Sequence, residues 1–176
     1  MQLILFIIII PILISAAIAG LSAAPWLPTK PKQRRHVIDA VKPAKDAVCY
    51  DLGCGDGSVL FALAKAYPGI RAIGYDISLL PLAVGIVRKY LGGKTYKNIS
   101  LRFGNLFTQS VSDADIVFVF LLDKSYPRLA KKFAEELKDD AVVIVEAWPF
   151  KEITPARTLR EEGLLPVYFY NGSDFR

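Results

Sequence analysis

Apolar residues divide the chain into one long run and a series of shorter segments. Residues 1–29 carry no charged side chain, and almost every position between Leu3 and Ala24 is apolar. An α-helix rises about 1.5 Å per residue, so this stretch is long enough to cross a hydrocarbon core of roughly 30 Å. The pattern predicts a single transmembrane helix that contains Pro11, a residue that membrane helices tolerate.

A cleaved signal peptide is the alternative interpretation of the same residues. Small side chains between Ala17 and Ala24 resemble a cleavage site. However, the first two residues include no Lys or Arg, and the apolar run is longer than the usual signal-peptide core of about 7 to 15 residues. These two features favour a retained membrane anchor over residues 1–29.

Basic residues follow the apolar run directly. Six Lys and Arg residues against two Asp residues give residues 30–46 a net charge of +4, so only +1 of the chain's total +5 remains for residues 47–176. By the positive-inside rule, this juxtamembrane linker places the N-terminus outside the cell and the following domain in the cytoplasm. The linker also suits anionic lipid headgroups, which we favour over nucleic acid because the domain behind it is nearly neutral.

Residues 47–176 alternate between short apolar segments typical of buried strands and amphipathic segments typical of helices. Strands are expected at residues 47–52, 70–75, 99–103, 115–120, 141–147 and 167–170. Helices are expected at residues 36–41, 58–67, 78–92, 125–137 and 154–162. This alternation predicts one α/β domain with a mostly parallel sheet of about six strands and right-handed crossovers.

A glycine-rich turn between the first strand and the helix after it is the clearest candidate binding motif. Asp51 ends the strand, and Gly53, Gly55 and Gly57 follow at alternating positions. Glycine lets the backbone turn tightly and lets a ligand approach it closely. Dinucleotide-binding folds space their glycines as G-x-G-x-x-G, and the alternating spacing here therefore argues against NAD.

Two polar residues after later strands extend the candidate site. Asp76 follows the second strand, 23 residues beyond Gly53. This is close to the offset of about 20 residues at which an acid accepts hydrogen bonds from ribose hydroxyls. Asn105 follows the third strand. Alone, each would be read as an ordinary capping or turn residue, but together with the glycine turn they favour a nucleoside cofactor.

The remaining candidates for metal or redox chemistry are few. The two cysteines, Cys49 and Cys54, are too few and too closely spaced for a zinc site, and a disulfide framework is not expected. The lone His36 lies in the basic linker, where it is expected to be solvated. The sequence therefore predicts no metal.

The sequence DLGCGDG at residues 51–57 resembles the signature of Rossmann-like methyltransferases that use S-adenosylmethionine. In that class the loop packs against the amino-acid end of the cofactor. The resemblance implies that Asp76 binds the ribose, that Asn105 lies near the adenine, and that Leu106 lies beside the adenine ring. It also implies a Rossmann-like methyltransferase fold whose last hairpin is shortened here.

The whole layout resembles one group of these enzymes in particular. They are the small membrane-anchored lysine methyltransferases of mitochondria, which trimethylate lysines of the adenine nucleotide translocase or of the ATP synthase c-subunit, and their prokaryotic relatives. The resemblance covers most of the chain and rests on the anchor, DLGCGDG, GYDIS, VFLLDKSYPRLAKKF and EAWPF. Two departures, Asp123 and the short C-terminal end, leave the acceptor open.

Catalytic candidates come from the ends of the fourth and fifth strands. Methyl transfer to lysine needs an aligned neutral amine, whereas a free lysine has a pKa near 10.4. A nearby acid can take the proton, and an aromatic ring can cradle a cationic methyl donor. Asp123 and Trp148 are the first candidates for these roles, followed by Tyr126 and Glu146.

Three functions are consistent with this sequence. The favoured one is methylation of a lysine in a membrane-associated protein, which explains why the domain is held near the bilayer. The second is methylation of a lipid, a quinone or another small molecule. The third is a membrane-tethered protein that binds S-adenosylmethionine without turnover.

Overall fold

A seven-stranded sheet forms the centre of the molecule. The computed structural model describes residues 2–176, apart from the side chains of residues 2–5 and 8. The strand order is β3-β2-β1-β4-β5-β7-β6. The strands are β1 (Val48–Leu52), β2 (Arg71–Asp76), β3 (Ile99–Phe103), β4 (Ile116–Val119), β5 (Val142–Glu146), β6 (Arg157–Leu159) and β7 (Val167–Asn171).

The first five strands are parallel, and the last two form an antiparallel edge. β1 pairs with both β2 and β4, so the strand order reverses beside β1. Connections on either side of such a reversal diverge and leave a crevice at the carboxyl ends of the strands, where ligands bind. β7 pairs antiparallel with β5 and with β6.

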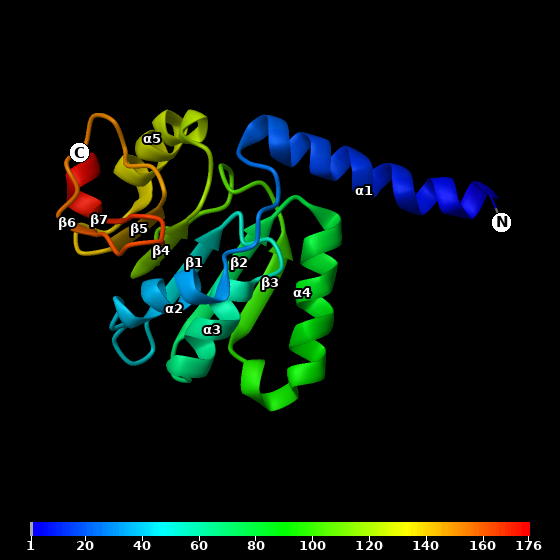
Figure 1. Ribbon diagram of the computed structural model, residues 1–176, viewed down its shortest axis with the longest axis horizontal. Coiled ribbons are helices and arrows are strands. Elements are labelled where there is room, and N and C mark those ends of the chain that lie inside the picture. The colour runs from blue at the N-terminus through cyan, green and yellow to red at the C-terminus, as the bar shows by residue number, and fades with distance from the viewer. Residues whose placement is uncertain (1) are drawn as a thin grey trace.

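Helices cover both faces of the sheet, and one helix projects from it (Figure 1). Side chains from α2, α3 and α4 join one buried cluster, and side chains from α5 and η3 join the other. The helices are α1 (Gln2–Ser22), α2 (Pro31–Asp39), α3 (Ser58–Ala66), α4 (Leu79–Gly92) and α5 (Tyr126–Glu136), with 3-10 turns η1 (Gly93–Tyr96), η2 (Asp123–Ser125) and η3 (Gly172–Phe175).

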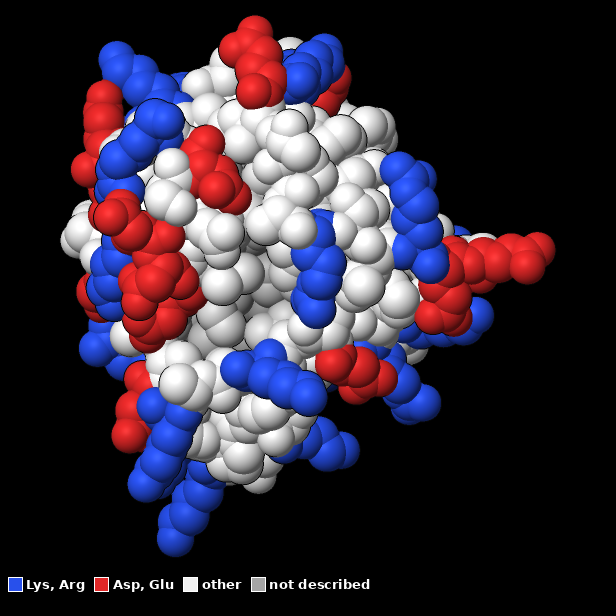
Figure 2. All heavy atoms as spheres, turned by 90° about the vertical axis from the view of Figure 1, so that its left-hand side faces the viewer, with Lys and Arg blue, Asp and Glu red and all other residues white. Residues whose placement is uncertain are grey.

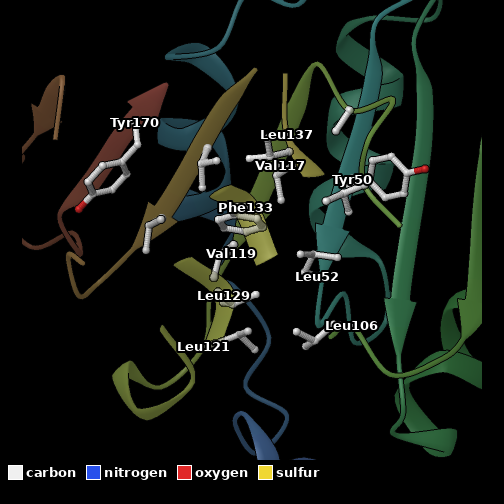
Figure 3. Close-up of a cluster of buried hydrophobic side chains, with 14 of the residues drawn as sticks. Tyr50, Leu52, Leu106, Val117, Val119, Leu121, Leu129, Phe133, Leu137 and Tyr170 are labelled. Carbon is white, nitrogen blue, oxygen red and sulfur yellow. The ribbon is translucent and has the colours of Figure 1, made fainter. Parts of the chain in front are cut away.

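The two clusters explain why the strands read as continuous apolar runs. All four residues of β4 are buried, because alternate side chains enter opposite clusters. Figure 3 shows Val117 and Val119 on the side of the sheet where Leu129 and Phe133 of α5 lie, and all four belong to one buried cluster. The predicted α/β architecture with a mostly parallel sheet is therefore confirmed.

The prediction of six strands and of a helix at residues 154–162 was wrong. Residues 157–159 form β6, which pairs with β7. The guanidinium of Arg157 lies 4.0 Å from the ring centre of Phe169 and donates a hydrogen bond to the Ala40 carbonyl. These long-range contacts override a weak local helical pattern between Pro155 and Gly163.

The start of α2 differs from the sequence prediction, whereas α4 begins where it is expected. α2 begins at Pro31 rather than at residue 36, with proline in the first turn, where its missing N–H costs nothing. Ser78 occupies the N-cap position of α4, but its side chain makes no capping hydrogen bond. Instead, the Leu79 N–H donates to the hydroxyl of Ser15 in α1.

The C-terminal part of α1 is docked onto the domain. Ser15, Ala19 and Ala23 are buried. The Lys124 ammonium donates to the carbonyl oxygens of residues 20 and 21 at 2.8 and 3.0 Å, which satisfies acceptors that a helix end leaves free. The Leu122 N–H donates to the Ala23 carbonyl.

The predicted transmembrane segment is described only in part. The side chains of Leu3, Ile4, Leu5 and Ile8 lie outside the described residues. Among the residues that are described, no helix reaches the combination of length and apolar character needed to cross a membrane.

Close packing of α4 onto the glycine turn generates a stability prediction. A Cβ atom on Gly85 would lie 2.6 Å from the Asp56 carbonyl oxygen, a backbone atom that cannot rotate away. Overpacking of this kind costs about 1–3 kcal/mol. We expect Gly85→Ala to lower the midpoint of chemical unfolding. Gly20→Ala, where a Cβ meets nothing within 4 Å, is the control and should leave it unchanged. Equal stability of the two variants would contradict the contact.

Candidate active site

A pocket opens at the carboxyl ends of the parallel strands, where the topology favours a ligand. Its lining comes from the glycine turn after β1, from the segments that follow β2, β3 and β4, and from the end of β5. A further wall is unexpected: residues 22–29, which connect α1 to α2, cross the pocket and line it. The C-terminal end of the predicted anchor, residues 22–29, is thus part of the site.

The glycine turn takes backbone conformations that favour glycine. Gly53, Gly55 and Gly57 have φ values of +89°, +53° and +71°. A Cβ on Gly55 would lie 2.7 Å from two atoms of the Trp26 indole, so the ring rests directly on the backbone of the turn. The Gly53 N–H donates to the Tyr75 carbonyl at 2.9 Å, which fastens the turn to β2.

Asp76 fixes the turn through its carboxylate. One oxygen accepts the Gly55 N–H and the other accepts the Ser78 N–H, each at 2.7 Å. Because a carboxylate oxygen accepts more than one hydrogen bond, both oxygens keep capacity for hydroxyl groups in the pocket that Asp76 lines. Its contact with the ribose stays a prediction.

Asn105 and Leu106 form the wall after β3. The Asn105 side-chain oxygen accepts the Phe107 N–H at 3.0 Å, so the residue is also the turn asparagine that the sequence allowed. Leu106 is buried, and both residues line the pocket. An apolar side chain beside an amide suits a flat heteroaromatic ring.

The pocket is strongly acidic. Asp51, Asp56, Asp76 and Glu146 line it, and no Lys, Arg or His is found among the described lining residues. Burial raises the pKa of Asp51 well above its usual range, and the Glu146 carboxyl is the largest of the charges that raise it further. Carboxyl groups without nearby cations favour a positively charged ligand.

Glu146 is the carboxyl group with the most unusual environment. It ends β5, is 4% exposed, and its Oε2 has no hydrogen-bond partner. Burial raises its pKa from 4.5 to about 7, against a smaller opposing effect of the Gln33 amide. A buried carboxyl that titrates near neutral pH and lines a pocket is a candidate proton acceptor.

The two residues predicted to be catalytic lie outside this pocket. The Asp123 carboxylate pairs with the Lys151 ammonium at 3.2 Å and lines a neighbouring groove between α5 and residues 149–153. Trp148 is 44% exposed and lines neither the pocket nor the groove. Their catalytic roles stay predictions, whereas Glu146, ranked below them from the sequence, is brought beside the glycine turn.

Trp26 is the lining residue that sequence reasoning missed. A tryptophan between two prolines at the end of an apolar run is typical of a membrane interface. No local pattern indicates that residues 22–29 fold back over a turn near residue 55. For Glu146 a signal existed, because one carboxylate ends an otherwise apolar strand.

This arrangement is that of a Rossmann-like methyltransferase that uses S-adenosylmethionine. Five parallel strands continue into an antiparallel edge, and the turn after β1 meets an acid at the end of β2. Residues 51–157 match the family model described as the ANTKMT methyltransferase domain. The chain belongs to that family and is a methyltransferase.

Similar proteins agree with this assignment. The chain is 30% identical over 149 residues to a protein-lysine N-methyltransferase of Saccharolobus islandicus, covering 83% of this chain and 92% of that protein. It is 29% identical over 152 residues to the human lysine N-methyltransferase of the ATP synthase c-subunit, covering 86% of this chain and 63% of that protein. The RNA methyltransferase of Salinibacter ruber, solved with S-adenosyl-L-homocysteine, has a TM-score of 0.77 at 25% identity, with 82% of this chain and 93% of that chain covered.

The residues of the pocket fit S-adenosylmethionine. Asp76 offers acceptors for ribose hydroxyls, Leu106 offers an apolar surface, and the positive φ values of Gly53 and Gly55 shape the turn that lines the pocket. The acidic lining suits the sulfonium and the ammonium of the cofactor. Among residues 2–176, no cluster of three or more potential metal ligands is found.

The position of Trp26 generates a fluorescence prediction. The chain has two tryptophans, of which Trp26 lines the pocket and Trp148 does not. We expect S-adenosyl-L-homocysteine to change the emission of Trp148→Phe, in which Trp26 is the remaining fluorophore, and to leave Trp26→Phe unchanged. Loss of the ring in Trp26→Ala should weaken binding about fivefold, as expected for a ring contact of roughly 1 kcal/mol. A full emission change in Trp26→Phe would contradict this placement.

The raised pKa of Glu146 predicts how stability depends on pH. The folded state holds this proton more tightly than the unfolded state, so the stabilisation is complete below pH 4.5 and is lost as the pH rises to about 7. The loss amounts to about 3 kcal/mol. We expect Glu146→Gln to unfold at a higher temperature than the wild type at pH 8 but not at pH 4.5. The exposed substitution Glu162→Gln serves as the control. A Glu146→Gln effect that is the same at both pH values would refute the assignment.

Proposed function

We propose that this methyltransferase transfers a methyl group to the side-chain amine of a lysine in a protein held at the membrane. The observation that carries the proposal is the buried, unpartnered carboxyl of Glu146 in a pocket whose described lining has four acids and no basic residue. Such a pocket attracts an ammonium group and repels a phosphate. It therefore favours lysine over RNA as the acceptor.

Glu146 supplies the proton chemistry that lysine needs. When bound, S-adenosylmethionine supplies an electrophilic methyl group on a positively charged sulfur. The lysine ammonium must first lose a proton, because only the neutral amine has a free electron pair. The Glu146 carboxylate can orient the ammonium and accept its proton at Oε2, which carries no other hydrogen bond. A base with a pKa near 7 is suited to this task at neutral pH.

Related proteins support lysine as the acceptor. The Saccharolobus islandicus relative is named a protein-lysine N-methyltransferase, and the human relative is named for lysine of the ATP synthase c-subunit. The Salinibacter ruber structure is that of an RNA methyltransferase, so the fold alone does not choose between these acceptors. The acidic lining is what favours an amine.

Attachment to a membrane is the second part of the proposal. In α1 the large side chains that are described point outward, including Phe6, Ile7, Ile10 and Leu13, each 47% or more exposed. Apolar surface of this extent is stable in lipid rather than in water. The basic linker at residues 30–46 supports an orientation with the N-terminus outside and the methyltransferase domain in the cytoplasm.

A transfer assay tests the acceptor and the role of Glu146 together. Full-length protein is incubated with membranes and a donor carrying a radioactive methyl group, and label is counted in protein, RNA and lipid fractions. We expect label in protein lysines. We also expect the wild-type rate to rise with pH through about 7, as Glu146 ionises. Glu146→Gln should lose this inflection and at least a hundredfold in rate, as expected for a general base.

Controls separate a catalytic effect from a binding effect. Glu146→Gln should bind S-adenosyl-L-homocysteine about as well as the wild type, and Glu162→Gln should transfer methyl groups at the wild-type rate. Label confined to lipid or RNA would overturn lysine as the acceptor. An unchanged pH profile in Glu146→Gln would overturn the role of the carboxyl.

A further inference from the structure

The outer face of α4 carries an apolar stripe that the domain does not cover. Its members are 50% to 84% exposed and are spaced so that they lie on one side of the helix. They are Leu80, Val84, Val87 and Leu91. The neighbouring Tyr90 is 78% exposed. A continuous apolar surface of this kind marks a site of interaction.

The charged residues of α4 and of the segment that follows it are all basic. Between Asp76 and Asp113 the sequence contains no acidic residue. The same interval contains five basic residues, namely Arg88, Lys89, Lys94, Lys97 and Arg102. An apolar helix face bordered by Lys and Arg is typical of a helix that lies on an anionic bilayer surface.

The position of α4 places this stripe at the base of α1. The Leu79 N–H donates to the Ser15 hydroxyl at 3.1 Å, and the two helices are in contact. In Figure 1, α1 leaves the domain past one end of α4, and the two helix axes run in clearly different directions. A membrane crossed by α1 would therefore lie next to α4.

We propose that α4 lies in the membrane interface, with its apolar stripe toward the acyl chains and its basic residues toward anionic headgroups. This inference rests on the proposed membrane attachment of α1. In the docked part of α1, Ile18 and Leu21 are each 50% or more exposed, and so is Ile14 just before it. These side chains would add to the immersed surface.

The opposite end of the molecule has a different surface. Figure 2 shows the side away from the N-terminus of α1, where acidic and basic side chains are interspersed. That mixture is typical of a surface in water. The active-site pocket, which residues 22–29 help to line, then lies close to the headgroups, and the acceptor lysine must lie close to the bilayer as well.

Depth-sensitive fluorescence tests the immersion of α4. A thiol-reactive, environment-sensitive dye is attached to Val87→Cys in the full-length protein, which is reconstituted into phosphatidylcholine and phosphatidylglycerol vesicles. The natural cysteines, Cys49 and Cys54, are buried, and burial raises the pKa of the Cys49 thiol to about 12, so they react poorly. Brominated lipids should quench most of the emission at residue 87. The same dye at Glu162→Cys should remain unquenched.

A third labelled position separates this inference from the anchor on which it rests. Ile10→Cys reports whether α1 itself enters the bilayer. Quenching at residue 10 without quenching at residue 87 would overturn the interfacial role of α4 and leave the anchor intact. The absence of quenching at both positions would overturn both proposals. Quenching at residue 162 as well would also overturn the oriented immersion.

A paired substitution gives a functional readout. Val84→Glu combined with Val87→Glu places charges on the stripe at exposed positions, so the fold should be retained. A carboxylate is unfavourable among acyl chains, so we expect at least a tenfold loss of methyl transfer to membranes. Binding of S-adenosyl-L-homocysteine should not change. Transfer to membranes at the wild-type rate would contradict the proposal.

Discussion

The structure depends on the packing of one backbone turn, residues 53–57, between a strand end and a helix. The carboxylate of Asp76 accepts a hydrogen bond from the Gly55 N–H of the turn. Gly85, which has no side chain, allows α4 to pack closely against the Asp56 carbonyl. Because Gly55 has no Cβ atom, the Trp26 ring can lie directly on the backbone of the turn where the turn lines the pocket. The helix that supports the turn is also the helix that carries the exposed apolar stripe, so the cofactor site and the proposed membrane-facing surface share one element.

The acidic lining of the pocket has a cost in stability. Buried carboxyl groups without partners are unfavourable, and Glu146 and Asp51 respond with raised pKa values. A cationic donor and a cationic acceptor would relieve part of this cost when they bind. We infer that these buried carboxyl groups are retained because they favour positively charged substrates. Active sites commonly contain groups that lower stability but are needed for function.

The sequence predicts most of the sheet but only part of the site. The strand at residues 99–103 is found at its predicted bounds, because local alternation and flanking turns define it. β6 was missed because its pairing with β7 is long-range. The glycine turn and Asp76 could be found from spacing within a single unit of strand, helix and strand. Trp26 could not, because its contact with Gly55 depends on how a distant segment folds back.

Calorimetric titration of full-length protein with S-adenosyl-L-homocysteine tests the central claim most directly. The comparison is between the wild type and Gly55→Val, in which a branched side chain would project from the turn into the place that the Trp26 ring now holds. We expect saturable binding of one ligand to the wild type and none to the variant. The circular dichroism spectrum of the variant should match that of the wild type. Binding to both proteins with equal affinity would show that the ligand lies elsewhere.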